Sequence, residues 1–321
     1  MSTIKIKEIA KIAGVSPSTV SNALNGQKNI GKATREKILK LCEEKGYTPN
    51  LMGKNLKIGR TKTVVFNFSD FDRSFYLDII KGISDNLFQN GYDLIICTNK
   101  SSKNFMNSSF TCGAICLDIK MTNNDIISFA EDNFPIIVMD RIIDHSCIKN
   151  VIVDNYPIMC QLVQKIIDKG FRRFGFIGGP TDTLDNQERF QALLDTLEEN
   201  SIEFDHKNYY HGDFREKSGY QAAKIMLMSG SIPEVIVCSN DNMAIGAIRA
   251  FKENGFQIPA DIAISGFDNA EKAELAGLTT VEIPRYESGF LAAKSLLEMI
   301  EGRAQQETYK IKANIVWRST V

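Results

Sequence analysis

The chain has 321 residues, and its hydrophobic and charged fractions, 43% and 24%, are those of an ordinary globular protein. This length predicts two or three domains. No apolar stretch is long enough for a signal peptide or a membrane span, so the sequence argues against a secreted or membrane protein and predicts a cytoplasmic one.

The seven cysteines show no metal-binding or disulfide pattern. Their number is odd, they are scattered, and the close pair Cys112 and Cys116 has no second pair or histidine near it in the sequence. We therefore expect free thiols and no bound metal.

The net charge of −1 conceals a strong segregation of charge along the chain. Residues 1–60 carry twelve Lys or Arg against four Glu, an excess of eight positive charges, which leaves an excess of nine negative charges on the rest. A small basic segment joined to an acidic body is typical of a polyanion-binding module attached to a second domain.

Residues 6–24 show the pattern of a helix-turn-helix unit. The first helix carries apolar residues at helical spacing, namely Ile6, Ile9, Ala10 and Ala13. Gly14 and Val15 then interrupt this period, as a short turn containing glycine does. The pattern therefore predicts a helix, a tight turn and a second helix.

The second helix is predicted to begin with Ser16 as its N-cap and Pro17 at its first position. Val20 and Leu24 lie four residues apart and anchor it to the first helix. Its remaining side chains are short and polar: Ser18, Thr19, Ser21, Asn22 and Asn25. Base edges in the major groove are read by hydrogen bonds, so such a helix predicts DNA binding.

A third helix is predicted from Ala33 to Lys45, with Ile38, Leu39 and Leu41 facing inward. Pro49 ends it, because proline disfavours helical backbone in the residue before it.

From Lys62 onward, short apolar runs alternate with longer amphipathic ones. The runs predicted as strands are TVVFNF, YDLIIC, GAICL, PIIVM, RFGFIG, EVIVC and IAISGF. The predicted helices are Phe75–Asn90, Pro157–Lys169, Arg189–Asn200, Gly219–Ser229 and Met243–Asn254. This alternation predicts parallel sheets of βαβ units. This number of strands predicts two sheets, and therefore two lobes with a cleft between them. In such sheets, ligands bind beyond the carboxyl ends of the strands.

Three segments carry a family resemblance: IAKIAGVSPSTVSNALNG, TREKILKLCEEKGYTPN and IPADIAISGFDN. They resemble the LacI/GalR family of bacterial transcription regulators, and the likeness runs from Thr3 to the C-terminal VWRST. It implies an all-α helix-turn-helix head and a two-lobed α/β body like that of periplasmic binding proteins, with parallel, Rossmann-like sheets.

The resemblance also implies domain boundaries. The DNA-binding head would span residues 1–49, a hinge helix or linker residues 50–60, and the effector-binding and dimerisation body residues 61–321. Lobe 1 would comprise residues 61–153 and 284–311, and lobe 2 residues 154–283 and 312–321. The chain departs from the family where Ser101–Thr111 is short and polar in place of a long helix, and where Cys112 replaces an aspartate.

The DNA contacts implied by the resemblance are Ser16, Pro17, Ser18, Thr19, Ser21, Asn22, Asn25, Lys54 and Leu56. Leu56 stands where the family inserts a leucine into the minor groove, which kinks the duplex. Packing of Leu56 on the body is the alternative. Asn22 replaces a common arginine, and asparagine favours adenine over guanine.

The effector contacts implied by the resemblance are Phe75, Tyr76, Asp140, Arg189, Phe214, Asn240 and Asp268. Carboxylates, a guanidinium fork and an aromatic ring together suit a polyol. The alternative for Phe75 is a core residue, and we expect Asp241 to cap a helix rather than bind ligand. Arg73 fits either an anionic effector or a plain surface residue. Thr183 lies where purine-sensing members carry a short arginine-bearing insertion, and the absence of this insertion disfavours a purine effector.

The resemblance thus implies an effector-controlled transcription regulator, a repressor, that binds a pseudo-palindromic operator as a homodimer. Its effector would be a carbohydrate, either a sugar or a sugar phosphate, and it would need no cofactor or membrane. The alternative is a sugar-binding protein without DNA function, which would have a signal peptide and lack the basic head. An enzyme is disfavoured, because FIGGP lacks the G-x-G-x-x-G order and the three histidines form no catalytic pattern.

Overall fold

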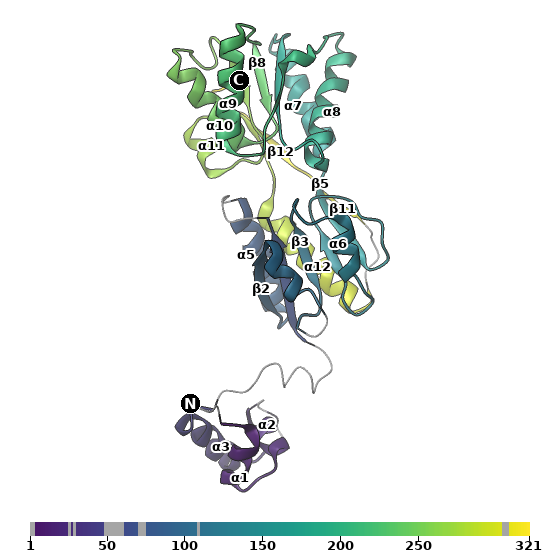
Figure 1. Cartoon of the computed structure of the whole chain (residues 1–321), viewed down its shortest axis with the longest axis vertical. Helices are drawn as coiled ribbons and strands as arrows, with labels where there is room; N and C mark the ends of the chain where they lie inside the picture. The colour runs from purple at the N-terminus through teal and green to yellow at the C-terminus, as the bar shows by residue number, and fades with distance from the viewer. Residues whose placement is uncertain are drawn as a thin grey trace. The chain divides into compact units, whose positions relative to one another are not determined.

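The computed structural model describes residues 4–24, 27, 30–47, 61–69, 75–107, 110–303 and 308–321. The chain forms two compact units, Met1–Thr61 and Lys62–Val321. In Figure 1 the first unit is a small cluster of helices and the second consists of two α/β lobes.

The first unit, the head, contains three helices: α1 (Ile6–Ala13), α2 (Pro17–Leu24) and α3 (Lys32–Glu44). Gly14 ends α1 with a left-handed backbone, φ 73°, which glycine adopts without steric cost. The three helices share one core made of Ile9, Ala10, Ala13, Val20, Ala23, Ile38 and Cys42. The predicted helix-turn-helix unit is therefore present.

The prediction that Leu39 faces inward is wrong, because its side chain is 42% exposed. The third helix buries Ile38 and Cys42, which are four residues apart and share one face. Leu39 follows Ile38 by one residue, about 100° around the helix, and so turns away from that face.

Lobe 1 of the second unit is built on a six-stranded parallel sheet in the order β11-β5-β4-β3-β1-β2. The strands are β1 (Thr63–Phe68), β2 (Asp93–Thr98), β3 (Ala114–Leu117), β4 (Ile136–Val138), β5 (Ile148–Val153) and β11 (Thr308–Ile311). Helices α5 (Phe75–Gln89) and α12 (Arg285–Ile300) cover one face. The other face carries α6 (Asn123–Phe129) and the 3₁₀ turn η1 (Asn99–Asn104). Because both faces are covered, β1 is buried along nearly its whole length and is mostly apolar.

Helices α5 and α12 lie side by side although they are far apart in the sequence, as the blue and yellow ribbons of Figure 1 show. Glycines permit this close approach. A methyl group on Gly82 of α5 would collide with the carbonyl oxygen of Tyr286, and one on Gly289 of α12 would collide with that of Ile79. The C-terminal helix is thereby fixed to lobe 1.

Lobe 2 has a four-stranded parallel sheet in the order β7-β6-β8-β9. The strands are β6 (Phe174–Gly178), β7 (Tyr209–His211), β8 (Val235–Cys238) and β9 (Ala263–Ser265). One face packs against α7 (Asn155–Asp168) and α8 (Leu184–Glu199), and the other against α9 (Glu216–Ser229), α10 (Asp241–Glu253) and α11 (Glu271–Leu275). The turn η2 (His206–Asn208) precedes β7, and β10 (Thr280–Glu282) pairs antiparallel with β12 (Asn314–Val316) beside α7.

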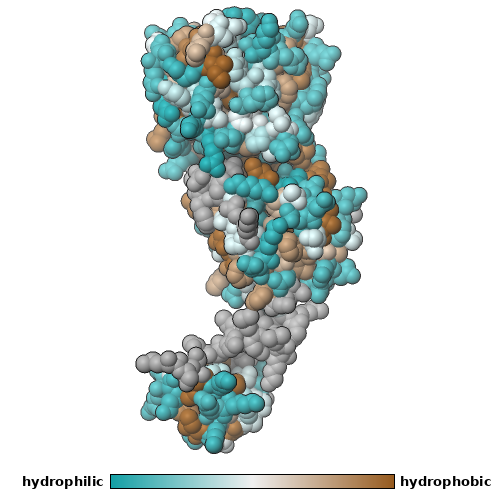
Figure 2. Space-filling model, viewed as in Figure 1, coloured by the Kyte–Doolittle hydropathy of each residue, from teal (hydrophilic) through white to brown (hydrophobic). Residues whose placement is uncertain are grey.

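The two-lobed parallel α/β architecture predicted from the sequence is confirmed, and each of the seven predicted strands is present. Helix α8 begins at Leu184, five residues before the predicted start. The described residues between 101 and 111, which are 101–107 and 110–111, contain the end of η1 and no long helix, as expected. Figure 2 shows that hydrophilic residues cover most of the visible face of the lobes. Within the described ranges, no helix combines the length and apolar character needed to cross a bilayer.

Candidate functional site

The start of α2 presents small polar side chains to solvent. Ser16 is the N-cap, since its Oγ accepts a hydrogen bond from the Thr19 backbone N–H at 3.1 Å. The same oxygen lies 2.6 Å from the Ser18 hydroxyl and 2.9 Å from that of Thr19. Ser16, Pro17 and Ser18 are exposed. The predicted cap is therefore present, and it orders the three hydroxyl groups at the exposed end of the helix.

The other predicted DNA contacts divide into two groups. Thr19, Ser21 and Asn22 are half-buried on α2. Asn25, Lys54 and Leu56 lie outside the described residues, as does the whole proposed hinge segment, residues 50–60. The α2 helix is held in the head by Val20 and Ala23, which are fully buried. Its polar residues thus stand on a helix whose opposite side is anchored in the core.

In the second unit, a cavity of about 1060 Å³, counting its solvent-open mouth, lies between the two lobes. It is lined by the residues at the carboxyl ends of strands in both sheets, where open parallel sheets bind ligands. The cavity brings together all seven predicted effector contacts: Phe75, Tyr76, Asp140, Arg189, Phe214, Asn240 and Asp268. Thr183 also lines the cavity, whereas Arg73 lies outside the described residues.

The lobe 1 wall of this cavity is largely apolar, with one acidic group. Ile79, Leu117 and Met139 line it beside the two aromatic residues. Tyr76 is buried against Phe68, whereas Phe75 is half-buried. Asp140 follows β4, and burial raises the pKa of its carboxyl group. This wall can cover the apolar face of a ligand and offer one acceptor.

The lobe 2 wall is polar and is organised around Arg189 of α8, which is 3% exposed. Its Nε donates to Asn155 Oδ1 at 2.9 Å, and its Nη1 donates to the Ser239 carbonyl at 2.7 Å. The guanidinium lies over the Phe267 ring, 3.7 Å from its centroid. These contacts fix the position of the guanidinium. Its remaining nitrogen, Nη2, lies 3.8 Å from a carboxylate oxygen of Asp185, which is longer than a hydrogen bond.

At the start of α10, Asn240 and not Asp241 caps the helix. Asn240 is the N-cap, since its Oδ1 accepts from the Met243 N–H at 3.0 Å. The expectation that Asp241 caps this helix is wrong. Asp241 is buried and instead accepts from the Thr280 hydroxyl at 2.5 Å and from the Ala270 N–H at 2.7 Å. It therefore holds the loop that follows β9.

That loop carries Asp268 into the cavity on an unusual backbone. Asp268 and Asn269 both have positive φ, 111° and 50°, a region that L-residues rarely adopt. Arg285 at the start of α12 stabilises both by donating to their carbonyl oxygens at 2.6 and 3.3 Å. Its Nε lies 3.3 Å from Asp78 of α5. Asp268 is thus placed by contacts that also reach lobe 1.

Phe214 closes the cavity from lobe 2. Its backbone φ is 65°, and its carbonyl accepts from Asn240 Nδ2 at 3.0 Å. Its ring packs on Gly179 so closely that any side chain at Gly179 would collide with it. The aromatic ring therefore has a fixed position at the wall.

Three polar residues line the cavity that the sequence did not single out: Asp185, Asn242 and Ser288. Asp185 could have been found, because it lies one helical turn before Arg189. The predicted start of α8 at Arg189 left it outside the helix. Across the described part of the chain, no group of three or more His, Cys, Asp or Glu residues is placed to hold a metal ion.

Two family descriptions match the chain. Residues 5–50 match "Bacterial regulatory proteins, lacI family", and residues 163–321 match "Periplasmic binding protein-like domain". The probable HTH-type transcriptional repressor ExuR of Bacillus subtilis (strain 168) is 32% identical over 308 residues, which are 92% of this chain and 92% of that protein.

Solved structures are similar to this chain as well. A sugar-binding transcriptional regulator (LacI family) from Enterococcus faecalis is 29% identical, with a TM-score of 0.75 over 81% of this chain and 98% of that one. The lac repressor dimer bound to operator and the anti-inducer ONPF shares the fold, with 24% identity and a TM-score of 0.86 over 99% of each chain. The chain therefore belongs to the LacI family of bacterial regulatory proteins and is a DNA-binding transcription regulator, not an enzyme.

Proposed function

We propose that this protein is a cytoplasmic repressor that binds a pseudo-palindromic operator as a homodimer and is controlled by a carbohydrate bound between its lobes. The observation that carries the proposal is the cavity that gathers Asp140, Arg189 and Asp268 in a chain that also has a helix-turn-helix head. Repression is supported by the name of the Bacillus subtilis relative, and the dimer on operator by the lac repressor structure.

The DNA contacts we propose are the predicted ones on α2 (Ser16, Pro17, Ser18, Thr19, Ser21 and Asn22), together with Asn25, Lys54 and Leu56. The exposed hydroxyl groups of α2 suit base edges, and the excess of positive charge in residues 1–60 suits the phosphate backbone. We assign residues 1–49 to the head, 50–60 to the hinge and 61–321 to the body. Two copies would place their α2 helices in successive major grooves.

The effector contacts we propose are the seven cavity residues of the sequence prediction together with Asp185. Asp140 and Asp268 would accept hydroxyl protons, Arg189 would donate through Nη2, and the Phe214 ring would cover a C–H face. A polar wall opposite an apolar one fits a sugar ring, which has hydroxyl groups on its edge and apolar faces. The Enterococcus faecalis regulator is described as sugar-binding, which supports this class.

Two experiments on the full chain test the proposal. Selection from random duplexes should recover pseudo-palindromic sites with half-sites about one helical turn apart. A thermal-shift screen of neutral sugars, sugar acids and sugar phosphates should find compounds that raise the melting temperature, because a ligand that binds only the folded state stabilises it by mass action. Absence of any selected sequence, or a screen in which no carbohydrate shifts the melting temperature, would refute the corresponding half of the proposal.

A further inference from the structure

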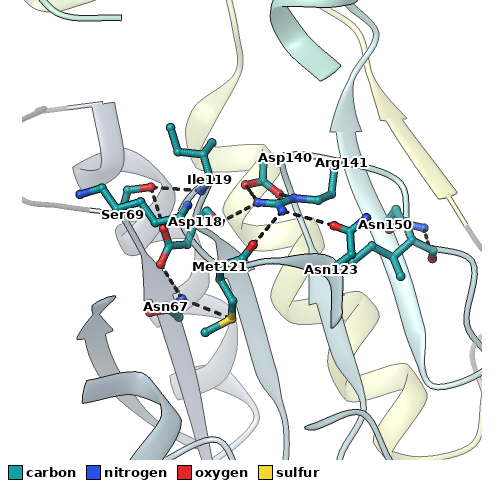
Figure 3. Close-up of polar contacts among 11 residues, drawn as sticks. Asn67, Ser69, Asp118, Ile119, Met121, Asn123, Asp140, Arg141 and Asn150 are labelled. Carbon is teal, nitrogen blue, oxygen red and sulfur yellow. Dashed lines mark hydrogen bonds and ion pairs between the residues drawn. The ribbon is translucent and has the colours of Figure 1, made fainter. Parts of the chain in front are cut away.

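A polar cluster surrounds Arg141 at the carboxyl end of the lobe 1 sheet, directly beside Asp140 (Figure 3). It draws on residues within or directly after β1, β3 and β4, on Asn150 within β5, and on the start of α6. Its labelled members are Asn67, Ser69, Asp118, Ile119, Met121, Asn123, Asp140, Arg141 and Asn150. Asp140 lines the cavity, and Arg141 does not.

All five N–H donors of the Arg141 guanidinium are used within this cluster. Nε and Nη2 each donate to one oxygen of the Asp140 carboxylate, both at 2.8 Å. Nη2 also donates to the Asp118 carbonyl at 2.6 Å, and Nη1 donates to the Met121 carbonyl at 2.8 Å and to Asn123 Oδ1 at 3.3 Å. No donor of the guanidinium is left over for a ligand, so Arg141 can act on an effector only through Asp140.

The surroundings of Arg141 are themselves held in place. The Asp118 carboxylate accepts from Asn67 Nδ2 at 3.1 Å and from Ser69 Oγ at 3.0 Å. The segment after Arg141 is fixed by Asn150, whose side chain bonds both the N–H and the carbonyl of Ile143, at 3.0 and 3.3 Å. The guanidinium fork therefore has one orientation.

A carboxylate oxygen can accept at two lone-pair positions. The bidentate pair with Arg141 occupies one position on each Asp140 oxygen and leaves one on each for a donor in the cavity. We propose that Arg141 is a positioning residue of the effector site, which holds the Asp140 carboxylate in a single orientation so that it accepts hydrogen bonds from effector hydroxyl groups. This inference rests on the effector role proposed for Asp140.

The charges around Asp140 explain why it needs this partner. Burial raises the pKa of its carboxyl group, the ion pair with Arg141 lowers it, and the neighbouring carboxylates of Asp185 and Asp118 raise it further. The adjacent Cys116 thiol is buried, and its own pKa is raised, so it stays uncharged. Without Arg141, the Asp140 carboxyl group would take up a proton at higher pH, and one of its acceptor positions would be replaced by an O–H donor.

A double-mutant cycle on the full chain tests the proposal. The variants are Arg141→Met, Arg141→Lys, Asp140→Asn and the double variant Arg141→Met/Asp140→Asn. The matched control is Arg173→Met, which removes a mostly exposed ion pair with Glu234 before β6. Binding of the carbohydrate with the largest thermal shift in the screen is measured by calorimetry.

We expect Arg141→Met and Asp140→Asn each to weaken binding about tenfold or more, in keeping with the loss of a charge-assisted hydrogen bond. The double variant should bind no more weakly than Asp140→Asn, and Arg141→Lys, which keeps the charge without the fork, should fall between wild type and Arg141→Met. Equal binding by wild type and Arg141→Met, or full additivity in the double variant, would overturn the proposal.

A second readout needs no carbohydrate. In protein labelled with ¹³C at the Asp carboxyl carbons, the Asp140 signal is identified by its loss in Asp140→Asn, and its titration midpoint is followed in each variant. We expect the midpoint to move upward in Arg141→Met and to stay in place in Arg173→Met. If the titration midpoint of Asp140 is unchanged in folded Arg141→Met, the positioning role of Arg141 is refuted, whatever the outcome of the carbohydrate screen. Failure of this inference can therefore be distinguished from failure of the proposed function.

Discussion

Asp241 shows how a single buried carboxyl group organises the effector cavity. It is fully buried at the start of α10, yet its two oxygens accept hydrogen bonds from the loop after β9 and from β10. Burial, followed by the nearby Asp268 carboxylate, raises the pKa of Asp241 to about 8. The group is therefore protonated at neutral pH, and it ties the loop that carries Asp268 to the helix.

This raised pKa makes stability depend on pH. Between its unfolded value of 3.8 and its folded value of about 8, the folded state retains a proton that the unfolded state releases, so stability falls as pH rises. The slope from this group is at most about 1.4 kcal/mol per pH unit. Asp241→Asn, which mimics the protonated acid, should flatten the slope in urea unfolding at pH 5.5, 6.5 and 7.5. The exposed Asp93→Asn serves as control, and an unchanged slope in Asp241→Asn would refute this account.

At the scale of residues, the sequence identified cavity groups that follow strands in the chain. Arg189 and Asp268 could be located because their motifs are local, and the lobes bring them together as expected. Arg141 was not predicted because its partners lie 1 to 23 residues away in the sequence and meet only when β3, β4 and the start of α6 are assembled. That Asn240 and not Asp241 caps α10 depends on backbone geometry that the residue types alone leave open.

The second helix of the head depends on its N-cap. Ser16→Ala removes the acceptor for the Thr19 N–H, which should destabilise the start of α2 by about 1 kcal/mol. Hydrogen exchange at the Thr19 amide should become about five times faster or more. Ser18→Ala retains the cap and is the matched control. Equal exchange rates in wild type and Ser16→Ala would show that the cap contributes nothing.

The close packing of α5 and α12 is the element-scale feature that binds the C-terminal part of the chain to lobe 1. Gly82→Ala would press a methyl group onto the Tyr286 carbonyl and force the helices apart. We expect a loss of about 1–3 kcal/mol in urea unfolding. Ser84→Ala, on the exposed side of the same helix, should change stability by less than about 0.5 kcal/mol. A Gly82→Ala variant as stable as this control would contradict the packing argument.

The elements that the sequence predicted are those with helical periodicity or a largely apolar run, such as α5, α7 and β1. The missed ones include the three-residue strands β7, β10 and β12, the edge strand β11, the longer strand β5, whose apolar residues are interrupted by Lys149 and Asn150, and the helix α12. A short edge strand carries too few apolar positions for a pattern, and its pairing partner is set by the assembled fold. The same holds for Leu39, whose orientation depends on where the other two helices lie.

At the scale of the whole molecule, the account requires specific and non-specific DNA binding to be separable. Leu56 lies outside the described residues, and we propose that it wedges into the minor groove. Leu56→Ala should lower affinity for the selected operator at least tenfold, because the kink in the DNA, which enlarges the contact between protein and duplex, is lost. Affinity for random duplex, and its salt dependence, should remain, since Lys and Arg contacts to phosphates are kept. Equal losses on both duplexes in gel-shift titrations would remove Leu56 from this role.

The central claim is that a carbohydrate in the interlobe cavity controls DNA binding by the head, and one coupled titration tests it directly. Operator affinity of the full chain is measured with and without a saturating amount of the carbohydrate that gives the largest thermal shift. We expect a change of at least tenfold, a coupling free energy of about 1.4 kcal/mol. Arg189→Ala and Asp268→Ala should keep the affinity of the ligand-free protein and lose this change. An operator affinity that the carbohydrate leaves unaltered in wild type, or alters equally in Arg189→Ala, would contradict the account.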